Sequence, residues 1–239
     1  INSQNVSNFE LIFFNDDVKT PSIYFESLRV KYQIINLSKD SPCGIRFQGL
    51  KILKELNFDT YIFQDCDDEL SVSRVKDVAL LAEKHQIVVN DLDLMGVTSN
   101  IYESRIWENR FKNIPLFNHR NILKFNFIGF GNTTVNKPML KFIPDRPIAD
   151  IVALDWYIFY SILKTSLSIG YFTSSSTTKY RQHPNNQIGI ADNDKLGRII
   201  EVKNQFNTLI GGNIIIEANK RFKLPNKKPN HFPFWWELK

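Results

Sequence analysis

The sequence has little cysteine and no long uninterrupted hydrophobic segment. Its 239 residues contain two cysteines, Cys43 and Cys66, which are too few for a disulfide framework. The polar N-terminus has no hydrophobic signal region, so we expect reduced thiols in a cytosolic protein. The longest apolar stretch, residues 148–172, carries three charged side chains. Each charge at a bilayer centre costs about 2.5–3.5 kcal/mol, so this stretch predicts a buried helix and not a membrane span.

Glycine is sparse, and the overall composition is ordinary. The chain has 10 glycines, and no glycine-rich, basic phosphate loop lies near its N-terminus. With 43% hydrophobic and 23% charged residues, the composition is that of a globular protein and excludes a disordered or fibrous one. The length suits one α/β domain with a small appendage.

The net charge of +5 belongs to the C-terminal 22 residues, and residues 1–217 are neutral overall. Residues 218–239, the basic tail, interleave lysines with aromatic side chains. We expect the aromatics to pack on the body while the lysines stay solvated. The alternative is peripheral contact with an anionic membrane surface, and nucleic acid ranks last. We therefore predict a cytoplasmic protein, with contact at the inner face of the membrane as an option.

Apolar, β-favouring runs alternate with helical patterns in the first half of the chain. The predicted strands are 9–14, 32–37, 60–64 and 86–90, and the predicted helices are 46–56 and 71–85. This order predicts an α/β fold with a mostly parallel sheet flanked by helices, whose ligands bind beyond the carboxyl ends of the strands. The second half is irregular. It shows a strand at 123–128, a turn-rich loop at 129–134, a helix at 148–168 and a polar linker at 173–178.

An acidic triplet follows the third predicted strand directly. Asp65, Asp67 and Asp68 repel one another unless a cation or donors offset their charge. Mg²⁺ or Mn²⁺, which prefer oxygen ligands and bridge to substrate phosphates, would do so. The alternative is a solvated acidic turn before the helix that begins at Ser71.

Four further residues could carry chemistry. Asp16 follows the first strand and could accept a hydrogen bond from a nucleobase or a ribose, although a local Asx turn is the favoured explanation when this position is taken alone. Asp155 lies inside the apolar helix at 148–168, where burial would raise its pKa toward that of a general base. A solvated position on that helix is the alternative. Arg181 and His183, in a loop rich in donors, could meet phosphate and metal or could simply be solvated.

The order of these motifs resembles a family 2 glycosyltransferase of the GT-A fold. The matching segments are Asn15–Asp17, Ser41-Pro42 with Ile45-Arg46, Phe63–Asp68, Gly131–Thr134, Leu154–Trp156 and Tyr180–His183 with Asn185, Asn186 and Gly189. The resemblance covers about residues 9–190, and its most specific parts are the acidic triplet, the Asp-Trp pair and the YRQH-type loop.

The resemblance implies a role for each matching residue. It assigns the nucleotide-sugar donor to Asp16, Arg46, Asp65, Asp67 and Arg181, and the metal to Asp67 with His183. It makes Asp155 the catalytic base. It places the acceptor against Trp156 and Asn132.

The implied activity is sugar transfer from a nucleotide-sugar donor to a glycan or glycolipid acceptor in cell-surface polysaccharide biosynthesis. The reaction would invert the anomeric centre and use Mn²⁺ or Mg²⁺. Residues 1–96 would form the donor half of the domain, and residues 97–217 the acceptor and catalytic-base half. The alternatives are a sugar nucleotidyltransferase and a degenerate family member that acts as a binding or scaffold protein.

One feature departs from the family. Its members have a strand, a nucleotide-contacting turn and a helix before the strand that we predict at 9–14, and only eight residues precede it here. Either the sheet lacks a central strand, or the N-terminal match is shifted along the chain.

Overall fold

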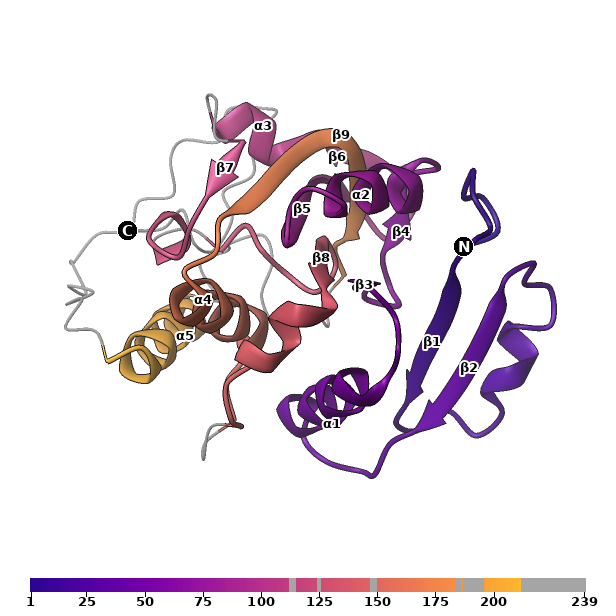
Figure 1. Cartoon of the computed structure of the whole chain (residues 1–239), viewed down its shortest axis with the longest axis horizontal. Helices are drawn as coiled ribbons and strands as arrows, with labels where there is room; N and C mark the ends of the chain where they lie inside the picture. The colour runs from indigo at the N-terminus through magenta and orange to yellow at the C-terminus, as the bar shows by residue number, and fades with distance from the viewer. Residues whose placement is uncertain (112–114, 124–125, 147–149, 184–185, 187–195, 212–239) are drawn as a thin grey trace.

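Strands and helices alternate along the chain, and the strands of the described residues form two separate sheets (Figure 1). The computed structural model describes residues 1–111, 115–123, 126–146, 150–183, 186 and 196–211. Residues 218–239, which hold the predicted basic tail, therefore lie outside the described residues, as do Asn185 and Gly189. Within the described ranges, no helix is long and apolar enough to cross a membrane.

The smaller sheet has two parallel strands, β1 (Glu10–Asn15) and β2 (Lys31–Asn36). Both strands were predicted, but as fully buried ones, and here β2 is mostly exposed while β1 is partly exposed. Among the described residues, neither β1 nor β3 has a strand on its other edge. Strand pairing among the described residues therefore does not join the two sheets.

The larger sheet has seven strands in the part of the chain that the structure describes. Its main path runs β3 (Thr60–Ile62), β8 (Thr133–Asn136), β5 (Ile87–Met95), β9 (Gly170–Arg181) and β4 (Glu69–Leu70). The short strands β6 (Ile101–Glu103) and β7 (Leu116–Phe117) pair with β5 and β9. β5 and β9 pair in parallel, and the other pairs in this sheet are antiparallel. The fold class is thus α/β as predicted, with a mixed central sheet.

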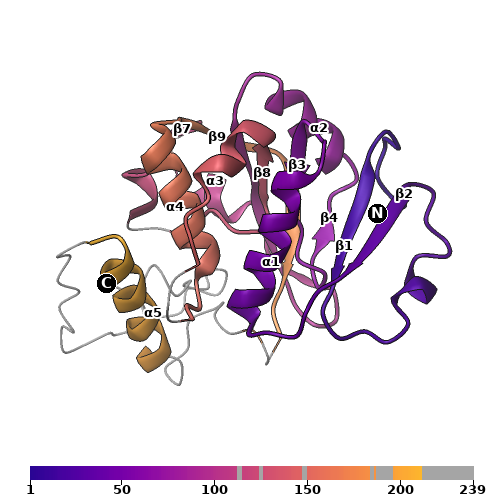
Figure 2. The same cartoon turned by 60° about the horizontal axis from the view of Figure 1, so that its bottom comes forward.

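Helices cover both faces of this sheet (Figures 1 and 2). Successive side chains of β5 point to opposite faces, so Ile87 and Val89 join one apolar cluster while Val88 joins another. The second cluster includes Val78 and Ala82 of α2 (Arg74–Ala82). The first is the main core and takes in side chains of α1 (Pro42–Glu55), α4 (Leu154–Ser166) and α5 (Leu196–Leu209).

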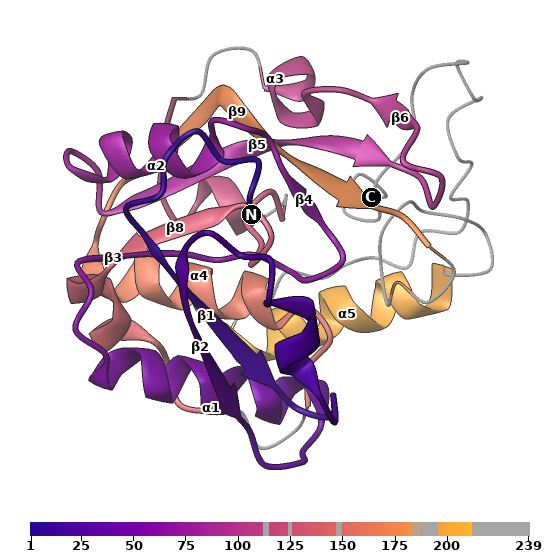
Figure 3. The same cartoon turned by 90° about the vertical axis from the view of Figure 1, so that its right-hand side faces the viewer.

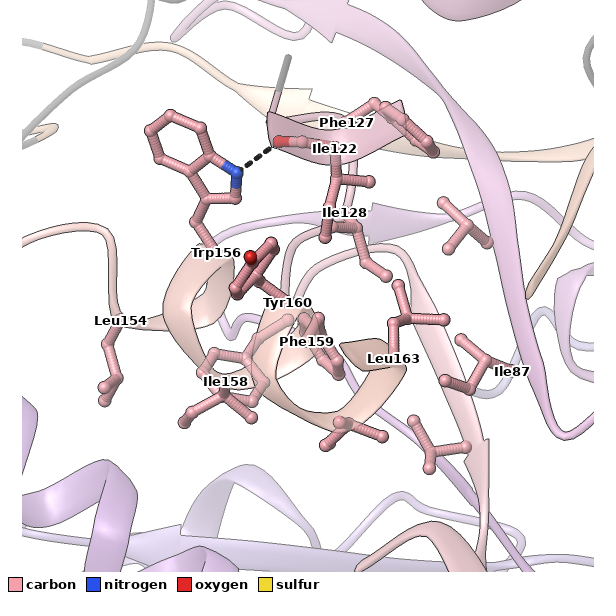
Figure 4. Packing of buried hydrophobic residues seen from close by; sticks show 14 of the residues in the cluster. Ile87, Ile122, Phe127, Ile128, Leu154, Trp156, Ile158, Phe159, Tyr160 and Leu163 are labelled. Atoms are coloured by element: carbon pink, nitrogen blue, oxygen red, sulfur yellow. Dashed lines mark hydrogen bonds between the residues drawn. The ribbon is translucent and has the colours of Figure 1, made fainter. Parts of the chain in front are cut away.

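Local chemistry explains where these helices begin. Ser41 caps α1 by accepting a hydrogen bond from the Gly44 amide at 3.1 Å, and Pro42 occupies the first turn, where a missing N–H is tolerated. α4 is apolar on almost every side and lies at the centre of the main core (Figure 4). It begins at Leu154, later than the helix predicted from 148.

Two elements predicted in the second half are wrong. The described part of 123–128 forms no strand, because Asn121–Leu123 is a 3₁₀ turn and residues 126–128 have no regular structure. The predicted linker at 173–178 lies inside β9. Thr173, Ser176 and Thr178 are buried there, and the Thr178 Oγ1 has long-range partners, since it bonds both Asn90 and the Gly131 carbonyl.

Candidate active site

The acidic triplet lies in the turn that joins β3 to β4, next to the last residues of β9 (Figure 3). The Asp68 amide donates to the Asp65 carbonyl at 3.3 Å and closes this turn. The Arg181 amide then donates to Asp68 Oδ1 at 2.8 Å, which ties the turn to β9. Strand ends that are far apart in the sequence therefore place the triplet against the predicted YRQH-type loop.

Asp67 and His183 are neighbours in this arrangement. Asp67 Oδ2 lies 3.0 Å from His183 Nε2, and both side chains keep contact with solvent. One carboxylate and one imidazole, with oxygen atoms of a diphosphate and water, form a suitable ligand set for Mn²⁺ or Mg²⁺. The described residues contain no group of three or more His, Cys, Asp or Glu side chains placed around one metal position. The fit is thus to a metal that also takes ligands from a substrate.

Asp68 has an unusual environment. Burial raises its pKa to about 8, opposed by the Arg181 amide, and Asp65 and Asp67 raise it further. Asp68 Oδ2 is buried and has no hydrogen-bond partner among the described residues. Burial also raises the pKa of Asp65, whose charge is offset by Arg46, with guanidinium and carboxylate 3.8 Å apart. The triplet thus carries less negative charge at neutral pH than its sequence suggests.

Asp155 occupies the first turn of α4, on the other side of the site. Loss of hydration raises its pKa to about 6, although Arg46 and the Trp156 amide oppose the rise. The Trp156 amide donates to Asp155 Oδ1 at 2.8 Å. A carboxyl with this pKa is largely ionised at neutral pH and can still accept a proton, as a general base must. The pKa of the Asp155 carboxyl is thus raised in the direction that burial predicts.

A single turn, Gly129–Asn132, connects the two groups of carboxylates. A Cβ on Gly129 would lie 3.1 Å from Asp155 Oδ2, and one on Gly131 would lie 2.8 Å from Asp68 Oδ2. Glycine at both positions lets the backbone approach the carboxylates without a steric clash. Arg46 extends over the same turn, with its guanidinium 5.5 Å from the centre of the Phe130 ring. The turn therefore fixes the position of Asp155 relative to the triplet.

Asp16 approaches the triplet from the small sheet. It is exposed after the end of β1, and its charge, after the larger effects of burial and Asp65, helps raise the pKa of the Cys66 thiol. The local turn proposed as the alternative involves Asn15, whose Oδ1 accepts from the Val18 amide at 2.9 Å. Asn15 therefore shapes the loop, and Asp16 is left exposed near the triplet.

The two residues assigned to the acceptor are buried. Asn132 is 2% exposed, and its side chain bonds Gly129, Asn90 and Phe127 through their backbone atoms. Trp156 is 3% exposed, stacks on Phe206 at 3.7 Å between ring centres and donates to the Ile122 carbonyl at 2.6 Å (Figure 4). Because both side chains are buried, they are not positioned to contact an acceptor directly. They support the residues that surround the site through hydrogen bonds and ring stacking.

Arg181 has several partners in the structure. Its guanidinium pairs with Glu69 at 2.8 Å and donates to the Asp67 carbonyl at 2.8 Å. Contact with a phosphate would require it to leave or share these partners. In the structure, Arg181 contributes to the site through its backbone amide, which donates a hydrogen bond to Asp68.

Sequence reasoning missed Arg74. The side chain is fully buried in α2, next to the triplet, and donates to Gln64, Asn90 and the Phe63 carbonyl. Helical periodicity could have found it, because Arg74, Val78 and Ala82 are spaced four apart and share the buried face. The strand predicted at 86–90 also extends further than expected, as far as Met95, and takes in Asp91. Asp91 lies within β5 and accepts the backbone amides of Trp107 and Glu108 at 2.8 and 3.0 Å.

Comparisons with known proteins identify the fold. No protein-family model matches the sequence, and a comparison with curated proteins finds no match. Among solved structures, S. aureus TarS is 16% identical over 87% of this chain and 38% of its own, with a TM-score of 0.54. TarS 1–349 in complex with UDP-GlcNAc is 14% identical over 87% of this chain and 64% of its own, also at 0.54.

A second type of neighbour agrees. GalNAc-T7 with UDP, GalNAc and Mn²⁺ is 11% identical over 74% of this chain and 38% of its own, with a TM-score of 0.51. TarS and GalNAc-T7 are GT-A glycosyltransferases, so the chain has a GT-A-like α/β fold, as predicted. The chain spans between 38% and 64% of the length of these neighbours.

Proposed function

We propose that the chain is a metal-dependent glycosyltransferase that moves a sugar from a nucleotide-sugar donor to a glycan or glycolipid acceptor. The observation that carries the proposal is the arrangement of Asp155 and the acidic triplet on either side of the Gly129–Asn132 turn, within a GT-A-like fold. It supplies a base with a raised pKa and a group of acids suited to a metal-bound diphosphate, within one site.

The donor would bind at the triplet. Asp67 and His183 would hold Mn²⁺ or Mg²⁺ together with the diphosphate, and the bound metal would offset the negative charge of the nucleoside diphosphate leaving group. Asp65, Arg46 and Asp16 surround this position and would contact sugar, phosphate and nucleotide. The neighbours crystallised with UDP-GlcNAc, and with UDP, GalNAc and Mn²⁺, support this class of donor.

Asp155 would act on the acceptor. As the acceptor oxygen attacks the anomeric carbon, the Asp155 carboxylate takes the proton from that hydroxyl and the sugar–phosphate bond breaks. A single displacement of this kind inverts the anomeric centre. The Arg46 guanidinium favours the ionised carboxylate electrostatically, and so keeps a larger fraction of Asp155 in its basic form.

The cellular setting of the proposal rests on the sequence. A role in cell-surface polysaccharide synthesis fits a cytoplasmic enzyme whose basic tail, residues 218–239, contacts the inner face of the membrane. Liposome co-sedimentation of the full chain and of a chain ending at residue 217 tests that contact. Equal binding by both forms would exclude the tail as the membrane-binding segment.

The Asp155→Asn variant tests the catalytic proposal. With Mn²⁺ and a panel of sugar nucleotides and glycan acceptors, we expect it to lose at least about 100-fold in transfer rate while keeping its affinity for the donor. Asp150→Asn is the matched control, because Asp150 forms an exposed ion pair with Arg146 at 3.3 Å. Transfer by Asp155→Asn at the wild-type rate would remove Asp155 as the base. Donor binding without turnover in the wild type would favour the binding or scaffold alternative, and synthesis of a sugar nucleotide would favour a nucleotidyltransferase.

A further inference from the structure

The buried guanidinium of Arg74 lies on the interior side of the acidic triplet. The Arg74 side chain is 0% exposed, and burial lowers its pKa to about 9, opposed by Asp68 and Asp65, so it stays charged at neutral pH. A buried guanidinium needs hydrogen-bond partners for its donors. Arg74 finds them at the end of β3, where Nη2 donates to the Phe63 carbonyl at 2.8 Å and Nη1 donates to Gln64 Oε1.

The remaining nitrogen reaches the central strand. Arg74 Nε donates to Asn90 Oδ1 at 2.7 Å, and Asn90 is itself 0% exposed. The Asn90 backbone in turn exchanges hydrogen bonds with Asn132, whose side chain holds the Gly129 amide. One continuous buried network thus joins the segment before the triplet to the glycine turn beside Asp155.

The charge of Arg74 has a second effect. It lowers the pKa of Asp65 and of Asp68, against the larger opposing effect of their burial. Arg46 also offsets Asp65, but from the solvent side, with its side chain 42% exposed. Arg74 is therefore the counter-charge on the protein side of the triplet and is screened little by salt.

We propose that Arg74 is a positioning residue, which acts through Gln64 and the Phe63 carbonyl to hold the acidic triplet in register with the Gly129–Asn132 turn. It does not touch the substrate. The inference rests on the proposed function, because it makes the geometry of the donor site depend on this buried side chain. Loss of a side chain that supports metal ligands from behind commonly weakens metal affinity by about 10- to 100-fold.

The test compares Arg74→Met and Arg74→Lys with Asn136→Ala. Asn136 is the matched control because it bonds the opposite end of α2, at the Ala82 carbonyl, and lies on β8 away from the triplet. For each full-length variant we would measure thermal unfolding, the affinity for Mn²⁺ with UDP by calorimetry, and amide hydrogen exchange of residues 63–70. Gln64→Ala, which removes the link and keeps the cation, replaces Arg74→Met if that variant does not fold.

We expect Arg74→Met to weaken Mn²⁺–UDP binding at least about tenfold and to speed exchange in residues 63–70, with partial rescue in Arg74→Lys. Asn136→Ala should lose stability without either change. If the wild type binds and Arg74→Met weakens binding no more than Asn136→Ala does, the inference is wrong and the proposed function stands.

If the wild type binds no sugar nucleotide or UDP, the proposed function fails, and hydrogen exchange decides the positioning role by itself. Faster exchange confined to residues 63–70 in Arg74→Met would support that role. Exchange equal to that of Asn136→Ala would overturn it.

Discussion

The two sheets of this protein differ in how firmly they hold their part of the candidate site. In β5, at the centre of the large sheet, nearly every side chain is buried, whereas β2 of the small sheet is mostly exposed. The large sheet carries the triplet, the glycine turn and the Arg181 loop, and the small sheet carries Asp16 alone. Groups proposed for metal and diphosphate thus lie on a rigid support, and the group proposed for the nucleotide lies on a lightly packed one.

Matched core deletions should show the largest contrast. Ile87→Ala in β5, where the side chain is fully buried, should lower the free energy of unfolding by about 2–5 kcal/mol. Ile34→Ala in β2, where the side chain is partly exposed, should cost about 1 kcal/mol or less. Chemical denaturation of both variants measures the difference. Equal losses would show that the small sheet is packed as firmly as the large one.

Carboxylate substitutions should separate the two sheets functionally. Asp67→Asn should weaken Mn²⁺–UDP binding by about 10- to 100-fold, which is about 1.4–2.8 kcal/mol. Asp16→Asn keeps a hydrogen-bond acceptor on an exposed loop and should weaken it by about fivefold or less. Calorimetry with UDP, with and without Mn²⁺, tests both. A larger loss in Asp16→Asn than in Asp67→Asn would reverse the assignment.

The pH dependence of sugar transfer should be set by Asp155 and not by Asp16 after the small sheet. Because burial raises the pKa of Asp155 to about 6, transfer should fall as the pH drops below about 6, where the carboxyl is protonated and cannot act as a base. Asp16→Asn should change the rate and leave this midpoint in place. The rate at saturating donor, measured from pH 5 to 8, gives the midpoint in both forms. A midpoint that moves in Asp16→Asn would place the small sheet in the proton transfer.

The smallest effect is expected where the N-terminal segment joins the body. Gln4 Nε2 donates to the Ser71 carbonyl at 2.9 Å, and Gln4 Oε1 accepts from the Val75 amide at 3.0 Å. Gln4→Ala removes both bonds and should cost about 0.5–1.5 kcal/mol, mostly as faster hydrogen exchange in β1. Unchanged exchange in β1 would mean that packing of Phe14 on Gly49 of α1 holds the small sheet by itself.

Local patterns predicted much of the first half of the chain. The strand before the triplet, the helix opened by Ser41-Pro42 and the raised pKa of Asp155 all follow from residues close in sequence. The failures depend on distant partners. Residues 173–178 of β9 have the sequence pattern of a polar linker, because no local pattern reveals that the buried Thr178 hydroxyl bonds Asn90 and the Gly131 carbonyl.

The same limit applies to side-chain roles. Asn132 and Trp156 were assigned to the acceptor because of their place in the motifs, and the structure buries them against Asn90 and Phe206. Arg74 was overlooked because a charged residue in a helix is usually solvated. Its spacing with Val78 and Ala82 indicates the buried face, but its partners, the Phe63 carbonyl and the side chains of Gln64 and Asn90, come from distant segments that the sequence does not bring together.

Under the proposed function, the turn at Gly129–Asn132 limits which substitutions the site accepts. Any side chain at Gly131 would crowd Asp68 and Asp65, and any at Gly129 would crowd Asp155, so a substitution in this turn disturbs either the residues proposed for the donor or the proposed base. Natural variants with a new donor preference should therefore keep both glycines. They should instead collect their substitutions around Asp16, where the exposed loop after β1 accepts new side chains without disturbing the chemistry.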